Sequence, residues 1–342
     1  MSRPAREHPL AARRLTALTL TAGAALLLTS TPALAEPKPS LEQVQRQVDD
    51  LYEEAEADTE LYNGLNEKQE QLQARAGTLQ QQVATQQDQL NRLRETLGAV
   101  AAEQYRSAGV DPTLRLMLTA DATEYLDGAS LQDAAAATQA DTLRLLTAQQ
   151  KRFDQLRDET AAQLAGLDQA RQAAAGKKQE VQAKLAKVQS ILNGLKAEDR
   201  AKVVAGNAGG AAASRSVTAR MPYSGPATGR VKDILTFAHA QLGKPYVYGA
   251  TGPNSFDCSG LTLRAFAAGG ISLPRTSQAQ YAAGKPIARD QLQPGDLVFY
   301  YPDLHHVGIY LGNGQLLHAP RTGKTVEIVP YDVMPYSGAM RY

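Results

Sequence analysis

A heptad repeat of apolar residues runs through residues 41–104 and restricts the fold of this chain more than any other feature. Fifteen of the nineteen a and d positions in this stretch are apolar. The four exceptions are Asp58, Gln69, Gln86 and Gln104. Nine heptads of this kind are typical of a coiled coil rather than of a globular amphipathic helix. A second, less complete series runs from Leu143 to Leu195, so residues 36–204 are predicted to be an all-α coiled coil.

The two heptad segments have nearly equal lengths, roughly 90 Å each at about 1.5 Å per residue. Pro112 lies between them and is the only proline between residues 40 and 221. Because proline breaks a helix, equal arms on either side of it predict an antiparallel hairpin with its tip at about residues 105–138. Periodicity leaves a parallel homodimer open as the alternative.

Apolar residues gather at the predicted tip. They are Leu114, Leu116, Met117, Leu118, Tyr125 and Leu126. Such a cluster either caps the hairpin or forms a docking surface for a partner protein.

Residues 36–204 carry 20 basic and 27 acidic residues. A solvated helical surface explains this excess of acidic residues without any partner.

The first 35 residues have the pattern of a secretory signal peptide. Four arginines precede an uncharged apolar stretch over residues 15–28, and Ala33-Leu34-Ala35 is typical of a cleavage site. As a helix the apolar stretch would span roughly 21 Å, less than the roughly 30 Å of a hydrocarbon core. We therefore expect residues 1–35 to direct export and to be removed, with an uncleaved membrane anchor as the alternative.

Charge and cysteine content exclude several classes of protein. The chain has 36 Lys and Arg against 35 Asp and Glu, so no charge excess indicates nucleic-acid binding. A single cysteine excludes a disulfide framework and a Cys-rich zinc site.

Residues 205–229 contain five glycines, seven alanines and no acid, a composition typical of a flexible linker. We expect this linker to separate the helical region from a domain at residues 230–342.

The predicted C-terminal domain combines helices in its first half with strands in its second. One amphipathic helix is predicted at residues 231–242, and another begins at Cys258. Strands are predicted at residues 296–300, 307–311, 315–318 and 325–329, and Gly312-Asn313-Gly314 is a hairpin turn signal. Helices followed by an antiparallel sheet make an α+β domain.

Cys258 is a candidate nucleophile because a thiol in the first turn of a helix meets the positive end of the helix dipole. That field favours the thiolate and is expected to lower the pKa of the thiol. An imidazole nearby would complete a thiolate–imidazolium pair, and a third polar group would orient the imidazole. His306 and His318 lie on or beside adjacent predicted strands, which would bring two such groups together. A buried thiol that acts as a small apolar side chain is the alternative.

Five short motifs occur in order across this domain. They are F-D-C-S-G-L at 256–261, L-P-R-T-S at 273–277, P-G-D-L-V-F at 294–299, H-V-G-I-Y at 306–310 and H-A-P at 318–320. Their spacing resembles that of the NlpC/p60 family of cell-wall cysteine peptidases, and the resemblance covers residues 230–342. It implies a papain-like fold for the domain. The layout of the whole chain also resembles exported peptidoglycan hydrolases in which a coiled coil precedes this domain.

The resemblance implies four catalytic roles. Cys258 matches the family nucleophile, and His306 matches the general base. His318 matches the third polar residue, which orients the base, and Tyr246 matches a tyrosine near the thiolate that helps to bind the oxyanion. No metal and no cofactor are implied.

Other residues of the domain match the family more loosely. Asp257, Ser259 and Arg275 match positions that line the substrate groove. The sequence departs from the family at Gly249-Ala250, where two glycines are common, and this small change leaves the catalytic roles intact. His239 is expected to be structural.

The resemblance also implies the substrate. The substrate is the stem peptide of peptidoglycan, cut between D-γ-glutamyl and the adjacent diamino acid through a thioester. With the signal peptide, the protein is expected to be secreted or extracytoplasmic and cell-wall associated. If the hairpin tip is a docking surface rather than a cap, its partner is expected to be a membrane-bound division or wall-remodelling protein. Amidase or transpeptidase chemistry on the same thiol, or a non-catalytic wall-binding role, are the alternatives.

Two further expectations follow from these assignments. A metal site at His305, His306 and His318 is disfavoured, because neighbouring residues on a strand point to opposite faces, and His305 is expected to be exposed or beside the site. A helical hairpin tethered to an enzyme that cuts the wall indicates control by location or by occlusion. The domain without residues 36–204 is therefore expected to be at least as active as the full chain.

Overall fold

The computed structural model describes residues 39–107, 118, 122–206, 223, 225 and 227–342. Residues Ser40–Tyr342 form one compact unit. The predicted signal peptide and most of the predicted linker lie outside the described residues, as do Pro112 and the tip residues Leu114, Leu116 and Met117. Within the described part of the chain, no helix has both the length and the apolar character that a membrane span requires.

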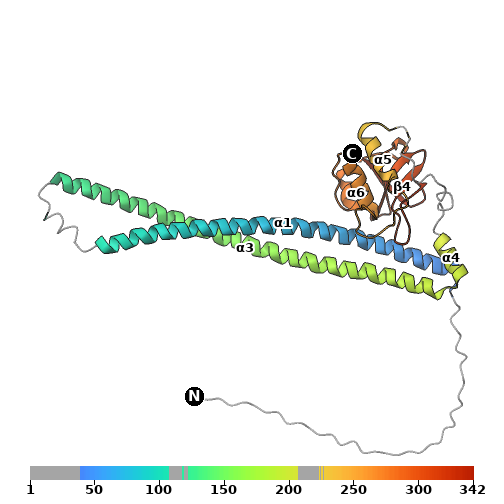
Figure 1. The fold of residues 1–342 in the computed structure, drawn as a ribbon, viewed down its shortest axis with the longest axis horizontal. Coiled ribbons are helices and arrows are strands. Elements are labelled where there is room, and N and C mark those ends of the chain that lie inside the picture. The colour runs from blue at the N-terminus through green and yellow to red at the C-terminus, as the bar shows by residue number, and fades with distance from the viewer. Residues whose placement is uncertain (1–38, 108–117, 119–121, 207–222, 224, 226) are drawn as a thin grey trace, which may run out of the picture. The chain divides into compact units, whose positions relative to one another are not determined.

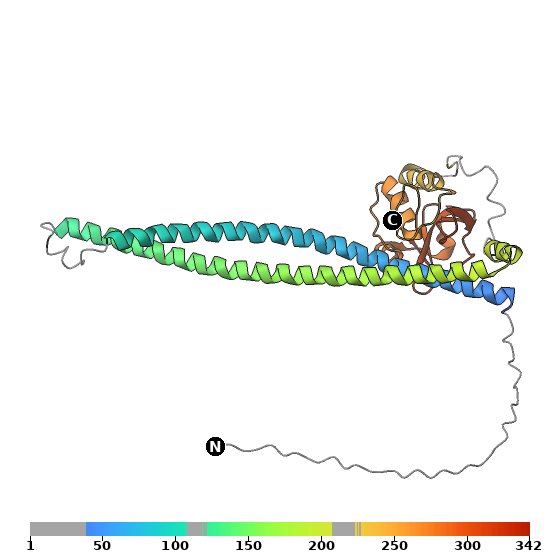
Figure 2. The same ribbon diagram turned by 60° about the horizontal axis from the view of Figure 1, so that its bottom comes forward.

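Two long helices, α1 (Leu41–Ser107) and α3 (Ala122–Gly194), lie side by side in both views (Figure 1 and Figure 2). Three polar pairs that connect them are Asp58–Lys177, Arg75–Glu159 and Gln86–Gln149. Higher residue numbers on α1 pair with lower numbers on α3, so the two helices are antiparallel. The predicted helical hairpin is confirmed, and a short helix, α4 (Ala197–Gly206), follows it.

Two of the polar residues that interrupt the heptads are explained by contacts across the hairpin. The buried carboxylate of Asp58 accepts hydrogen bonds from Lys177 at 3.1 Å and from Lys184 at 2.6 Å. Gln86 is also buried and donates to Gln149 at 2.5 Å. Buried polar pairs of this kind favour one register, because a shift would leave their groups unpaired.

The C-terminal part of the unit contains helices and one antiparallel sheet. The helices are α5 (Gly229–His239), α6 (Cys258–Ala268) and α7 (Ser277–Ala283), with a 3₁₀ helix, η2 (Arg289–Gln291). The strands are β1 (Lys285–Pro286), β2 (Leu297–Tyr300), β3 (His306–Gly312), β4 (Gln315–His318), β5 (Glu327–Pro330) and β6 (Tyr336–Arg341). Their order in the sheet is β1-β6-β2-β3-β4-β5, and every neighbouring pair is antiparallel. The predicted α+β class is confirmed, and the four predicted strands correspond to β2–β5.

Both faces of the sheet are buried. Side chains alternate along a strand, so Leu297 and Phe299 of β2 point into one apolar cluster while Val298 and Tyr300 point into another. The first cluster also contains Phe266 of α6. Val307 of β3 lies in the same cluster, so α6 packs against β3, and this packing positions Cys258 and His306 at the starts of the two elements.

Gly260 in the first turn of α6 has no room for a side chain. A Cβ atom there would lie 2.3 Å from the carbonyl oxygen of Ala250 and 2.7 Å from Asp257 Oδ1. Gly260→Ala is expected to lower the free energy of unfolding by about 1–3 kcal/mol, the usual cost of overpacking, as measured by thermal unfolding. Gly176→Ala in α3 is the control, since a Cβ there meets nothing within 4 Å, and it should leave stability unchanged or raised. An unchanged melting temperature for Gly260→Ala would contradict this packing.

Candidate active site

Cys258 is the first residue of α6, and Asp257 before it caps the helix. The Asp257 carboxylate accepts a hydrogen bond from the Gly260 backbone N–H at 2.6 Å, which satisfies one of the free N–H groups of the first turn. The Cys258 side chain is fully buried. Its Sγ lies 3.7 Å from the backbone oxygen of His305 and 3.8 Å from Glu60 Oε1. The predicted nucleophile therefore sits at the positive end of a helix, inside the protein.

His306 and His318 lie next to each other. His306 begins β3 and His318 ends β4, and the Nε2 atom of His306 lies 2.8 Å from the Nδ1 atom of His318. Both rings are buried, and a ring nitrogen of His306 lies within 4.8 Å of Cys258 Sγ. Because Nε2 of His306 contacts His318, Nδ1 is the nitrogen left to serve the thiol.

Glu327 extends this line of polar groups. It is the register partner of His318 on β5, and its Oε1 atom lies 3.9 Å from His318 Nε2, which has no hydrogen-bond partner among the described residues. Sequence reasoning missed Glu327. Its position in a predicted strand next to the strand of His318 was a usable signal.

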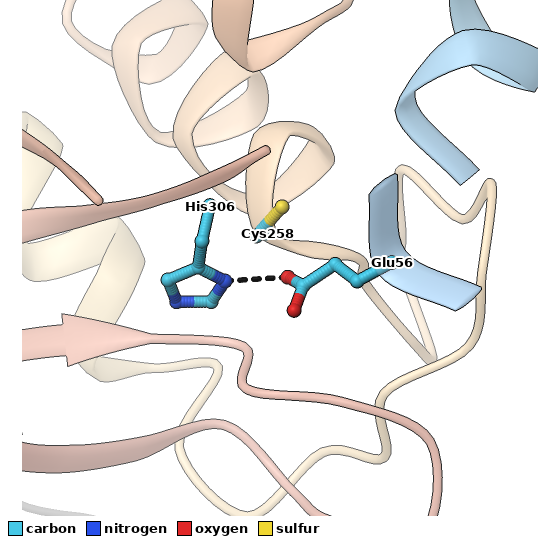
Figure 3. Close-up of side chains that lie close together, drawn as sticks. All are labelled: Glu56, Cys258 and His306. Atoms are coloured by element: carbon cyan, nitrogen blue, oxygen red, sulfur yellow. Dashed lines mark hydrogen bonds and ion pairs between the residues drawn. The ribbon is translucent and has the colours of Figure 1, made fainter. Parts of the chain in front are cut away.

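Helix α1 supplies a residue that sequence reasoning did not place in the site. The Glu56 carboxylate is hydrogen-bonded to Nδ1 of His306, the nitrogen that His318 leaves free (Figure 3). Glu56 is only 8% exposed, and one of its carboxylate oxygens lies within 4.8 Å of Cys258 Sγ. We call this the closed arrangement, in which α1 lies over the site. In it, Glu56 rather than Cys258 is hydrogen-bonded to Nδ1 of His306, the nitrogen that would take the thiol proton.

Glu60 lies one turn further along the same face of α1. Its Oε1 atom accepts a hydrogen bond from Ser259 Oγ at 2.7 Å. Its Oε2 atom accepts from the Ser277 backbone N–H at 2.6 Å and from the Ser277 hydroxyl at 3.1 Å. The Arg275 guanidinium donates to Ser259 Oγ at 2.8 Å and adds positive charge. We call Ser259, Arg275 and Ser277 the carboxylate cradle.

The three predicted groove residues lie together. Arg275 donates to Asp257 Oδ2 at 2.5 Å as well as to Ser259, so the three side chains form one network. Asn63 of α1 joins it by donating to Asp257 Oδ2 at 3.0 Å and to Glu60 Oε1 at 3.1 Å. Helix α1 therefore fills the place where these residues were expected to meet a substrate.

Burial determines the protonation of the central groups. It raises the pKa of the Cys258 thiol, and the charges of Glu60 and Glu56 raise it further. It lowers the pKa of His306 to about 3 and that of His318 well below its usual range. It also raises the pKa of Glu56 to about 8. The expected lowering of the thiol pKa is therefore wrong for the closed arrangement, because desolvation and nearby carboxylates outweigh the helix dipole.

Tyr246 is buried in the same apolar cluster as Cys258. Burial raises the pKa of its hydroxyl well above the usual range, and the nearby charges of Glu56 and Cys258 add to this effect. The hydroxyl therefore keeps its proton and remains a hydrogen-bond donor at any ordinary pH.

The other two histidines of the domain do not join the His306–His318 pair. His305 is buried rather than exposed, with Nδ1 at 2.6 Å from Asp303 Oδ1 and its ring stacked on Tyr301 at 4.2 Å between centroids. It lies beside the site through its backbone oxygen. The His239 ring packs against Tyr223 at 5.2 Å, as expected of a structural residue.

A cavity of about 300 Å³ remains next to these groups, lined by Glu56, His306 and His318 among others. A cysteine at a helix start, beside a histidine that a third polar group contacts, is the arrangement that a thiol nucleophile and its base require.

Several known proteins are similar to the C-terminal part of this chain. The NlpC/P60 family matches residues 243–339. A probable endopeptidase of Corynebacterium glutamicum is 44% identical over 126 residues, which are 37% of this chain and 60% of that protein. The probable endopeptidase p60 of Listeria monocytogenes is 50% identical over 111 residues, or 32% of this chain and 22% of that protein. The solved structure of the peptidoglycan hydrolase RipB from Mycobacterium tuberculosis is 35% identical and covers 33% of this chain and 64% of that one, with a TM-score of 0.31.

The C-terminal part of this chain is thus a domain of the NlpC/P60 family. The match lies within the domain predicted at residues 230–342 and leaves α1 and α3 outside it. The chain spans 60% of the length of the Corynebacterium protein and a smaller share of the Listeria protein.

Proposed function

We propose that this chain is an exported peptidoglycan hydrolase. It is a cysteine endopeptidase that cuts between D-γ-glutamyl and the adjacent diamino acid of cell-wall stem peptides. The observation that carries this proposal is the grouping of Cys258 with the His306–His318 pair inside an NlpC/P60 domain. The names of the relatives, which are probable endopeptidases, support the same class of reaction.

In the proposed reaction, His306 takes the thiol proton of Cys258 as Sγ attacks the amide carbon. The Cys258 backbone N–H and the Tyr246 hydroxyl stabilise the oxyanion. The intermediate collapses with cleavage of the C–N bond, His306 gives the proton to the leaving amine, and a thioester remains. Water, deprotonated by His306, hydrolyses the thioester and restores the thiol. His318 keeps the His306 ring in position throughout.

The carboxylate cradle supports an acidic substrate. Glu60 shows that a carboxylate can accept hydrogen bonds from Ser259 and Ser277 while it lies 3.8 Å from Cys258 Sγ. In a D-γ-glutamyl substrate, a free α-carboxylate lies only a few bonds from the carbonyl carbon under attack. The cradle therefore suits the D-glutamyl side of the scissile bond, with Glu60 in the place of the substrate carboxylate.

We further propose that the enzyme is latent while α1 lies over the site. Glu56 holds the nitrogen that must serve the thiol, and Glu60 fills the carboxylate cradle, so a substrate can bind only after α1 moves away. Exposed apolar residues near the far end of the hairpin are suited to a partner that would trigger this movement. They are Tyr105, Leu118, Leu126 and Leu131. We propose a membrane-bound division or wall-remodelling protein as that partner, and a cell-wall location after export.

Mass spectrometry of peptidoglycan digests tests the proposed reaction. The chain carrying Glu56→Gln and Glu60→Gln is used beside wild type, because the closed arrangement is expected to suppress the wild-type chain. New fragments that end in D-glutamate are expected, and they should disappear when Cys258→Ala is added. Stem peptides released whole from the sugar would indicate an amidase, and new cross-links a transpeptidase. Wall binding without any product would indicate a non-catalytic protein.

A further inference from the structure

Three side chains from three different elements meet in a buried cluster when the site is closed. They are Glu56 of α1, Cys258 of α6 and His306 of β3, and Figure 3 shows them together. One atom of each, a carboxylate oxygen, Sγ and a ring nitrogen, lies within 4.8 Å of the other two. The residues are 8%, 0% and 1% exposed, respectively. The proposed hydrolysis uses Cys258 and His306 but has no use for Glu56.

The donor atoms of this cluster suit zinc. Thiolate, imidazole and carboxylate are the ligand types that Zn²⁺ takes in proteins, usually with tetrahedral geometry. With bonds of about 2.0–2.3 Å, ligand atoms of a tetrahedral site lie roughly 3.5 Å apart. The thiol sulfur therefore has to move about 1 Å closer to the other two ligand atoms. The hydrogen bond between Glu56 and His306 has to break, so that both side chains can bind the ion.

The surroundings of His306 also suit a metal ligand. A histidine that binds a metal almost always donates its other ring N–H to a protein group, which fixes its tautomer. The Nε2 atom of His306 lies 2.8 Å from His318 Nδ1, so the tautomer with the proton on Nε2 meets this condition and leaves Nδ1 for the ion. The cavity of about 300 Å³ reaches Glu56 and His306 and gives an ion a path to them. It also leaves room for a water molecule as the fourth ligand.

The charges in the closed site favour a cation. Glu56, Glu60 and Asp257 are all buried there, and the Arg275 guanidinium is ion-paired with Asp257 at 2.5 Å. Clustered carboxylates cost free energy when water is excluded, unless opposite charge is brought in with them. A divalent ion at Glu56 supplies that charge.

We propose that Glu56, Cys258 and His306 form a zinc site that links α1 to the peptidase domain and keeps the site closed. Binding forms Zn–O, Zn–S and Zn–N bonds, releases the thiol proton and any proton on Glu56 to solvent, and changes no oxidation state. The ion bonds to Glu56 of α1 as well as to the candidate nucleophile and base, so α1 can leave only when the Zn–O bond to Glu56 breaks. This inference goes beyond the proposed peptidase activity, since it requires only the closed arrangement.

Titration of the full chain with Co²⁺ and Zn²⁺ tests the site directly. A tetrahedral Co²⁺ site with a thiolate ligand gives intense d–d absorption and a sulfur-to-metal charge-transfer band. One Co²⁺ per chain with both features is expected, and Zn²⁺ should displace it and raise the melting temperature. Cys258→Ala should remove the charge-transfer band. Glu56→Gln should weaken Zn²⁺ binding at least about tenfold in competition with a chromophoric chelator, since even outer-shell changes cost that much.

Glu54→Gln is the matched control for this test. Glu54 lies on the same helix, but its side chain is 59% exposed and contacts Lys184 of α3 at 3.1 Å, so zinc affinity should not change. Circular dichroism checks that the variants fold, and Glu56→Ala repeats the comparison with a shorter side chain. The proposal is overturned by wild-type affinity in both Glu56 variants, by a Co²⁺ spectrum without the thiolate band, or by no binding at all. Every readout is metal binding, so its failure is distinct from failure of the proposed peptidase activity.

Discussion

Replacing Glu56 and Glu60 together by glutamine is expected to raise the rate at which the full chain cleaves isolated muropeptides by at least about tenfold. Glu56 holds Nδ1 of His306, and Glu60 accepts three hydrogen bonds from Ser259 and Ser277. Hydrogen bonds to charged groups are worth about 1.5–3 kcal/mol each, and about 1.4 kcal/mol is a factor of ten in an equilibrium. Glutamine has only one acceptor oxygen, so at position 60 it loses either the bond from Ser259 or the bonds from Ser277, and a large share of the chains moves to the open arrangement.

The controls for this experiment separate occlusion from other effects of the helix. Glu54→Gln removes a carboxylate that contacts α3 and should leave the rate unchanged. Deletion of residues 36–204 should give activity equal to or above that of wild type, because it removes α1 altogether. All assays contain a chelator, which keeps the result independent of any bound zinc. An unchanged rate in the double variant, or lower activity after the deletion, would show that α1 does not hold the enzyme off.

The residues of the candidate catalytic group could be predicted because their signals are local. Cys258 follows an N-cap aspartate and precedes the close-packed Gly260, all within one short motif. His306 and His318 lie in strands joined by a tight turn, so their proximity follows from the hairpin. Short-range sequence patterns specify such arrangements well.

Glu56 and Glu60 could not be predicted in the same way. They lie 250 and 198 residues from the groups that they contact on His306 and Cys258. An acidic residue on a long helix has the same pattern whether it faces water or a second domain. The error in the expected thiol pKa has in part the same origin, because the charges of Glu60 and Glu56, which add to the effect of burial, come from α1.

The fold could be predicted where an apolar repeat continues over many residues. The nine heptads of α1 specify a helix, and two of its four polar exceptions, Asp58 and Gln86, pair across the hairpin. In contrast, β1 has only two residues, Lys285–Pro286, and exists through its pairing with β6. A segment of that length carries no pattern of its own, and its strand structure depends on the completed sheet.

In the background of Glu56→Gln and Glu60→Gln, Cys258→Ala and His306→Ala are each expected to lower kcat by at least about 10³-fold. A nucleophile and its base act as a unit, so the loss of either removes the whole covalent route and leaves only the effect of binding and of the oxyanion donors. The variant that carries both changes should therefore be no slower than either single variant.

His239→Ala is the matched control for the histidine replacement. It removes a ring that packs against Tyr223, and it should leave kcat close to that of the background. Circular dichroism and a stopped assay on a defined muropeptide provide the readouts. If the losses from Cys258→Ala and His306→Ala instead multiply in the combined variant, the two residues act independently. In that case His306 would not be the base that serves this thiol, because a base can contribute nothing once the thiol it deprotonates is absent.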